Sequence, residues 1–161
     1  MGYEQLLGNE RLKENLNSAA TTGKFSHFYV ISGPEGSGKR TLARLLSAAL
    51  VCSEQNKPCL TCSHCQKVAH NTHPDIIYVD DPEKKTVPVD LIRKAREDIY
   101  VRPNEASRKV YIIPRGQDLA VPGQNALLKI LEEPPAYGVF IILSDNPETL
   151  LPTVRSRCTE L

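Results

Sequence analysis

The chain has 161 residues, of which 40% are hydrophobic and 24% are charged, and its formal net charge is +1. A chain of this length folds as one ordinary domain that needs no disulfide bonds. Because its net charge is so small, bulk charge alone does not give the protein a strongly basic or acidic surface for binding a partner. It has no apolar run of the roughly 18 residues that span a bilayer and no secretory signal at its N-terminus, so the sequence predicts a cytoplasmic protein with no membrane partner.

Signals for helix and strand alternate along the chain. Apolar residues recur at helical spacing in residues 6–23, and Gly23 is a typical residue at which a helix ends. Residues 27–32 form a short apolar run that ends at a glycine-rich loop, and the Leu- and Ala-rich residues 40–52 favour a helix. The remaining predicted strands are residues 75–80, 109–113 and 139–143, and the remaining predicted helices are residues 89–101 and 122–133.

The predicted strands are continuously apolar and are separated by helices. That pattern is typical of a parallel sheet whose two faces are both covered. The sequence therefore predicts a three-layer α/β domain over residues 1–161, and it shows no internal repeat, low-complexity tract or linker.

The loop GPEGSGKRT, residues 33–41, nearly fits the phosphate-binding pattern G-x-x-x-x-G-K-[ST]. In such a loop, backbone N–H groups surround a phosphate, and glycines allow the chain to approach it closely. The residues that meet these demands are Gly33, Gly36, Gly38 and Lys39. Arg40 departs from the pattern, because a cation stands where a hydroxyl would bind magnesium, and Thr41 comes one position late. We expect a phosphate-binding shape without magnesium-dependent hydrolysis.

The strand expected to carry catalytic carboxylates lacks them. P-loop enzymes place an acidic pair at the end of a neighbouring strand, one carboxylate for the metal and one for water. Here residues 109–113 are followed by Pro114 and Arg115, and neither can bind magnesium or accept a proton. Whether the loop holds ATP, ADP, phosphate or nothing stays open. The rival interpretation is an autonomous ATPase that uses Lys39 and Thr41.

Four of the five cysteines lie close together, in the spacing C-x6-C-x2-C-x2-C. They are Cys52, Cys59, Cys62 and Cys65, and Cys158 stands apart. In a cytosolic chain this pattern indicates a metal rather than disulfide bonds, and zinc binds four thiolates tetrahedrally. Because no position remains for water, the sequence predicts a structural zinc site that folds the insertion over residues 52–65. The alternative is four free thiols. The nearby His64, His70 and His73 are predicted to lie at the surface.

Several motifs together resemble a known family. The stretches GPEGSGKRTLARLLSAAL, NALLKILEEPP and VRSRC, with the cysteine insertion after the first, resemble the AAA+ ATPase domain of bacterial clamp-loader subunits from Leu7 through Cys158. The resemblance implies an AAA+ P-loop NTPase fold and a place in the DNA polymerase III holoenzyme, a nucleotidyltransferase, in DNA replication. Motor subunits of this family keep the hydroxyl and the acidic pair, so the departures at Arg40, Pro114 and Arg115 make the chain similar to the delta-prime type. The family's lid and collar domains are not expected within these 161 residues.

The resemblance also implies a role for Arg157. In the family, the arginine of the SRC motif, here residues 156–158, reaches the ATP site of an adjacent motor subunit and stabilises charge on the transferred phosphate. An arginine supplied in trans contributes on the order of 10³- to 10⁵-fold in rate. The implied partners are the gamma/tau motor subunits and the delta subunit, and through the assembly the sliding clamp and primer-template DNA. Two simpler interpretations stay open: Arg157 is an ordinary surface arginine, or the whole chain is a zinc-stabilised DNA-binding module.

Overall fold

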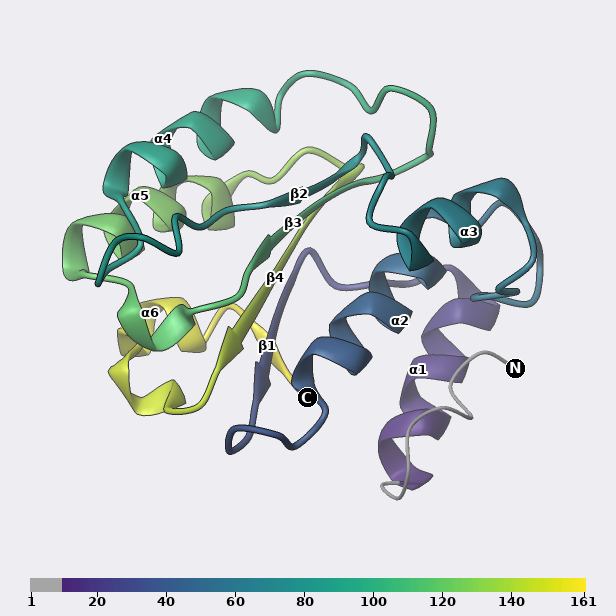
Figure 1. Ribbon diagram of the computed structural model, residues 1–161, viewed down its shortest axis with the longest axis horizontal. Helices are drawn as coiled ribbons and strands as arrows, with labels where there is room; N and C mark the ends of the chain where they lie inside the picture. Colours follow the sequence, from purple (N-terminus) through teal and green to yellow (C-terminus); the bar gives the residue numbers. More distant parts are fainter. Residues whose placement is uncertain (1–9) are drawn as a thin grey trace.

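The computed structural model describes residues 10–161, in which five parallel strands form one sheet with helices on both faces (Figure 1). The strands are β1 (Phe28–Ser32), β2 (Ile76–Tyr78), β3 (Lys109–Ile113), β4 (Gly138–Ser144) and β5 (Thr159–Glu160). The helices are α1 (Glu10–Thr22), α2 (Lys39–Val51), α3 (Ser63–Ala69), α4 (Val89–Asp98), α5 (Val121–Glu132) and α6 (Pro152–Arg155). Short 3₁₀ turns, η2 (Gly116–Asp118) and η3 (Pro147–Thr149), follow β3 and β4.

The strand order across the sheet is β2-β3-β4-β1-β5. The chain leaves β1, forms α2 and α3, and enters the sheet again at its far edge as β2, after which β3 and β4 bring it back beside β1. In open α/β sheets, ligands bind beyond the carboxyl ends of the strands, where the strand order reverses. The glycine loop leaves β1 at that end, so the topology places it where a ligand site is expected.

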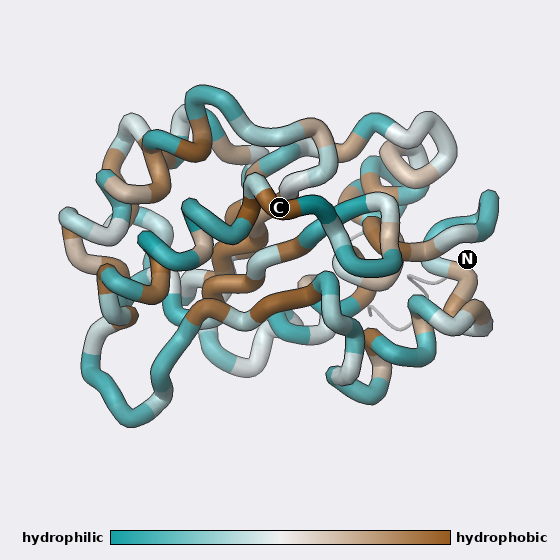
Figure 2. The backbone as a smooth tube through the Cα atoms, turned by 90° about the horizontal axis from the view of Figure 1, so that it is seen from above, coloured by the Kyte–Doolittle hydropathy of each residue, from teal (hydrophilic) through white to brown (hydrophobic). Residues whose placement is uncertain are grey.

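The two faces of the sheet bury separate apolar clusters. On one face Val110 and Ile112 of β3 pack with α1, α2 and α3, and on the other face Tyr111 and Ile113 pack with α4 and α5. Figure 2 shows hydrophobic segments through the centre of the fold and hydrophilic segments around it. Successive residues of a strand point to opposite faces, and both faces are covered, so the strands are apolar at nearly every position.

The predicted three-layer α/β architecture with a parallel sheet is confirmed. The sequence did not predict α3, which begins within the cysteine spacing, or β5, whose two exposed polar residues carry no strand signal. The helix predicted from residue 6 is found over Glu10–Thr22, and its first predicted positions lie outside the described residues. None of the helices within residues 10–161 is both long and apolar enough to cross a membrane.

Candidate functional site

The glycine loop joins β1 to α2 and turns at two glycines with left-handed backbone. Gly36 has a φ of 79°, and Gly38, which precedes the first residue of α2, has a φ of 92°. This conformation favours glycine, because the Cβ of any other residue would crowd the following carbonyl oxygen. The backbone N–H of Gly33 donates to the carbonyl oxygen of Ser144 at 3.2 Å and ties the loop to the end of β4. The predicted loop residues therefore form a tight turn at the carboxyl edge of the sheet.

The Lys39 ammonium lies over this loop. Its Nζ donates to the carbonyl oxygens of Gly33 at 2.6 Å and Pro34 at 2.8 Å. The side chain thus closes back on the loop that precedes it. An anion that binds the loop must compete with these two carbonyl oxygens for the ammonium, which lowers the net gain from the charge–charge contact.

A cleft of about 490 Å³ opens beside the loop. Its walls come from the loop and the start of α2, from Pro114, Arg115 and Gln117 after β3, and from Asp145 after β4. Lys39, Arg40 and Thr41 all line it, so the structure brings together the predicted lysine, its unusual arginine neighbour and the displaced hydroxyl.

Arg115 is held by carboxylates from two neighbouring segments. Its Nη2 lies 2.6 Å from Oδ1 of Asp80, which follows β2, and its Nη1 lies 3.4 Å from Oδ2 of Asp118 in η2. The guanidinium also donates to the carbonyl oxygens of Asp81 at 2.8 Å and Lys85 at 3.2 Å. Hydrogen bonding to Asp80 raises the pKa of Arg115. The carboxylates near the end of β3 are therefore engaged by a fixed cation.

A magnesium-bound nucleotide, which this kind of fold implies, does not fit these residues. Mg²⁺ requires oxygen ligands in nearly octahedral geometry, whereas Arg40 presents a guanidinium to the cleft. Glu35 and Asp145 also line the cleft. Within residues 10–161, however, the groups of three or more side chains placed to hold a metal ion lie elsewhere and include neither of these carboxylates.

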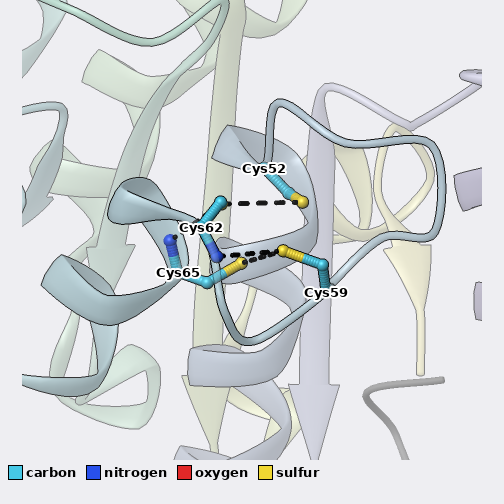
Figure 3. Close-up of side chains that lie close together, drawn as sticks. All are labelled: Cys52, Cys59, Cys62 and Cys65. Atoms are coloured by element: carbon cyan, nitrogen blue, oxygen red, sulfur yellow. Dashed lines mark hydrogen bonds between the residues drawn. The ribbon is translucent and has the colours of Figure 1, made fainter.

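One of those groups is the predicted cysteine cluster (Figure 3). Cys52 follows α2, Cys59 lies in the loop after it, and Cys62 and Cys65 lie at the start of α3. The four Sγ atoms lie within 4.8 Å of one another, with Cys59–Cys65 at 3.9 Å and Cys52–Cys62 at 4.0 Å. Four thiolates at Zn–S distances of about 2.3 Å in a tetrahedron are about 3.8 Å apart. The cluster therefore has the size and donor set of a site that could hold zinc.

Backbone N–H groups also point at these sulfurs. The N–H of Cys62 donates to Cys59 Sγ at 3.2 Å, and the N–H of Cys65 donates to Cys62 Sγ at 3.4 Å. For Cys59, burial raises the pKa, but hydrogen bonds from the backbone of Thr61 and Cys62 outweigh it and lower the pKa to about 6. Such bonds favour the thiolate, which is the form that binds a metal.

A second group of possible ligands, His64, His73 and Glu105, does not fit a metal. The backbone N–H of Asp75 donates to His73 Nδ1 at 3.0 Å, so the proton of the neutral ring lies on Nε2. That Nε2 lies 2.9 Å from His64 Nδ1 and donates to it. A protonated Nε2 has no lone pair for a metal ion. The prediction that His73 lies at the surface is wrong: its side chain is buried, because it joins α3 to the segment before β2.

Arg157 lies toward the amino ends of the strands, whereas the glycine loop lies at their carboxyl ends. It precedes β5, in which Thr159 is in register with Tyr29 near the amino end of β1, whereas the loop leaves the carboxyl end of β1. Its exposed guanidinium donates to the carbonyl oxygen of Thr153 at 2.8 Å and has no carboxylate partner among residues 10–161. Arg155, by contrast, donates to Glu160 Oε1 from Nε at 3.0 Å and from Nη2 at 2.9 Å.

The parallel sheet, its strand order and the glycine loop define a P-loop NTPase domain whose cation site is altered. The sequence model of the family described as "DNA polymerase III, delta subunit" matches residues 8–161. The chain belongs to this family, which confirms the predicted resemblance to the AAA+ domain of clamp-loader subunits.

Individual relatives are of more than one kind. The chain is 35% identical over 158 residues to DNA polymerase III subunit tau of Bacillus subtilis, a match that covers 97% of this chain and 28% of that protein. It is 36% identical over 138 residues to DNA polymerase III subunit delta' of Pseudomonas aeruginosa, covering 84% of this chain and 42% of that protein. The chain thus spans less than half the length of either relative.

A solved structure has the same fold. The gamma subunit-related protein of Thermotoga maritima superposes with a TM-score of 0.64 at 22% identity, over 92% of this chain and 44% of that one. At this identity the likeness supports the fold alone.

Proposed function

We propose that the chain is the nucleotide-binding-like domain of a delta-prime type clamp-loader subunit that does not hydrolyse ATP itself. The observation that carries this proposal is the Arg115 guanidinium, which engages Asp80 at 2.6 Å and Asp118 at 3.4 Å beside the cleft. A P-loop ATPase needs free carboxylates there for its metal ion and for water. Arg40 adds a second cation in the position where a magnesium ligand belongs.

The proposal assigns the chain a contribution to a neighbouring subunit through Arg157. This arginine does not line the chain's own cleft, and its guanidinium is exposed and without a carboxylate partner in the described part of the chain. A planar guanidinium with free N–H groups suits a phosphate of an adjacent ATP site. The motor subunits of gamma/tau type, the delta subunit, the sliding clamp and primer-template DNA are the proposed partners, with residues 52–65 as a zinc-binding insertion.

Two alternatives are less well supported. An autonomous motor ATPase is suggested by the similarity to the tau subunit of Bacillus subtilis, but it would have to work with Arg40 and Arg115 in its cleft. The second alternative is a DNA-binding module built on the cysteine cluster. The four sulfurs argue against it, because they face one another and are not directed at bases.

The test is DNA-stimulated ATP hydrolysis by the reconstituted loader with the full-length subunit as wild type, Arg157→Ala or Arg155→Ala. We expect Arg157→Ala to lower turnover at the site it serves by on the order of 10³-fold while the assembly still forms. Arg155→Ala is the matched control, because its guanidinium already pairs with Glu160, and turnover should stay near that of the wild type. Equal turnover in all three assemblies, or magnesium-dependent hydrolysis by this subunit alone, would overturn the proposal.

A further inference from the structure

Two adjoining cavities lie between α2 and the edge of the sheet at β2. The outer cavity has a volume of about 200 Å³ and the inner one about 70 Å³. Both are lined by Arg44, Asn71, Tyr78 and Ile112, so they form one pocket, which we call the α2–β2 pocket. The inner cavity, to which Ser47 contributes, shares no lining residue with the cleft beside the glycine loop and is therefore a separate feature of the fold.

Four polar side chains of this pocket have no partner in the described part of the chain. The Ser47 side chain is fully buried, and its Oγ has no hydrogen-bond partner, although a serine within a helix can bond to the carbonyl oxygen one turn earlier. The Arg44 guanidinium, the Asn71 amide and the Tyr78 hydroxyl make no hydrogen bond or ion pair within residues 10–161. Buried polar groups are nearly always paired, so the free Ser47 hydroxyl on a cavity wall indicates a polar atom inside the cavity.

The pocket is cationic at its mouth and closed at its inner end. Arg44 is exposed, whereas Ser47 is fully buried. The two residues are three apart on α2, so they lie on the same face of the helix, about 4.5 Å apart along its axis. Arg40, one turn before Arg44, lines the outer cavity as well and has no carboxylate partner within residues 10–161. A ligand in the pocket therefore meets positive charge at the mouth and a hydroxyl at the inner end.

The walls between these two ends are largely apolar. Val68, Ile76 and Ile112 line the inner cavity. His73 lines it too, but both of its ring nitrogens are already hydrogen-bonded within the protein. A phosphate dianion is costly to bring against such walls. A carboxylate carries a single charge, and its two oxygens match the fork of N–H groups on a guanidinium.

We propose that the α2–β2 pocket binds a small organic carboxylate that carries a hydroxyl or carbonyl oxygen at the other end of a short hydrocarbon chain. The carboxylate pairs with the Arg44 guanidinium, and the hydrocarbon chain packs on Ile76 and Ile112. The terminal oxygen forms a hydrogen bond with Ser47 Oγ. The inference goes beyond the proposed function, and it depends neither on Arg157 nor on the glycine loop.

The experiment is an NMR titration of the full-length protein, labelled at its isoleucine methyl groups, with γ-hydroxybutyrate, butyrate and butanol. The methyl groups of Ile76 and Ile112 report on the pocket, and that of Ile130, which is buried on the opposite face of the sheet, is the reference. We expect saturable shifts of the first two methyl groups alone. Butyrate, which lacks the hydroxyl, should bind roughly 2- to 10-fold more weakly than γ-hydroxybutyrate, and butanol, which lacks the carboxylate, roughly 10- to 100-fold more weakly.

Two variants assign the two ends of the ligand. Arg44→Gln should weaken γ-hydroxybutyrate binding by roughly 10- to 100-fold. Ser47→Ala should weaken γ-hydroxybutyrate binding to the level of butyrate and leave butyrate binding unchanged. It should not unfold the protein, because the hydroxyl that it removes has no partner within the fold. Arg102→Gln is the control, since Arg102 is exposed and lines neither cavity, and its affinities should equal those of the wild type.

Three results would overturn the inference. The first is no saturable shift of Ile76 and Ile112 at tens of millimolar of any probe, which would mean that the pocket holds water alone. The second is equal affinity for γ-hydroxybutyrate and butyrate in the wild type. The third is equal affinity of Arg44→Gln and Arg102→Gln for γ-hydroxybutyrate. A lowered turnover of the Arg157→Ala assembly would still stand in each case.

Discussion

The Nη2 atom of Arg115 lies 2.6 Å from Oδ1 of Asp80, and this pair joins the segment after β3 to the segment after β2. Nε of the same guanidinium lies 3.0 Å from both carboxylate oxygens. Only about a fifth of the Arg115 side chain and less of the Asp80 side chain is exposed, at 21% and 14%. The pair is thus shielded enough from water to stabilise the fold, and it closes one wall of the cleft.

Replacing Arg115 by alanine should therefore lower the free energy of unfolding. The change removes the partner of a largely covered carboxylate and two hydrogen bonds to carbonyl oxygens, so we expect a loss of about 1–3 kcal/mol. Urea denaturation of the variant and the wild type measures it. Arg93→Ala is the control, since Arg93 and Asp90 form an exposed pair at 3.4 Å, which should contribute less than about 0.5 kcal/mol. Equal losses for the two variants would contradict a structural role for the Arg115 pair.

A second carboxylate, Asp75, organises a loop and makes stability depend on pH. It is fully buried and accepts backbone N–H groups from Asn104, Glu105 and Ala106 at 2.5 to 2.9 Å. Burial raises its pKa, but these hydrogen bonds outweigh burial, and the pKa lies below its ordinary value. The ionised form is therefore favoured by the folded state.

We predict that Asp75→Asn destabilises the protein by about 1–3 kcal/mol at neutral pH, because the amide provides one acceptor oxygen in place of two. The folded pKa is below that of the unfolded chain, about 3.9 for aspartate. The stabilisation by Asp75 is therefore complete above that value and is lost as the pH falls through the folded pKa. The difference between variant and wild type, measured by denaturation from pH 7 to pH 3, should shrink toward acid. A constant difference across this range, or the same trend for the exposed control Asp90→Asn, would contradict the assignment.

The sequence predicts the sheet well and the ion pairs poorly, for a physical reason. Buried parallel strands are apolar along their length, and β3 and β4 are found where the apolar runs are. The glycine loop and the cysteine cluster are local spacings, which a sequence displays directly. The Asp80–Arg115 pair instead depends on β2 lying beside β3, and strand order is not written in any local pattern.

The sequence also gives no signal for the roles of Asp75 and His73, because both roles depend on tertiary contacts. Asp75 and its loop are separated by 29 residues or more and meet through the pairing of β2 with β3. His73 is buried because α3 packs its His64 against it, and α3 was not predicted. The sequence shows that no acidic residue directly follows β3. Only the tertiary structure shows that Arg115 pairs with Asp80 and Asp118.

The cysteine cluster gives a prediction about metal content. If the four sulfurs hold a structural zinc ion, the reduced protein should carry about one zinc per chain. Cys62→Ser should lower that content strongly, because a hydroxyl replaces the sulfur that lies 4.0 Å from Cys52 Sγ and caps α3. Cys158→Ser is the matched control, since Cys158 lies outside the cluster.

Hydrogen exchange then locates the effect of metal loss. Residues 52–65 contain no strand, and the apolar clusters on the two faces of the sheet contain many residues outside this segment. In Cys62→Ser, amides of the insertion and of α3 should exchange faster, while amides of β3 and β4 should keep their protection. Because metal binding is linked to local folding, adding a zinc chelator to the wild type should produce the same pattern. Full zinc content in Cys62→Ser, or loss of protection throughout the sheet, would show that the cluster does not act as a local zinc-dependent fold.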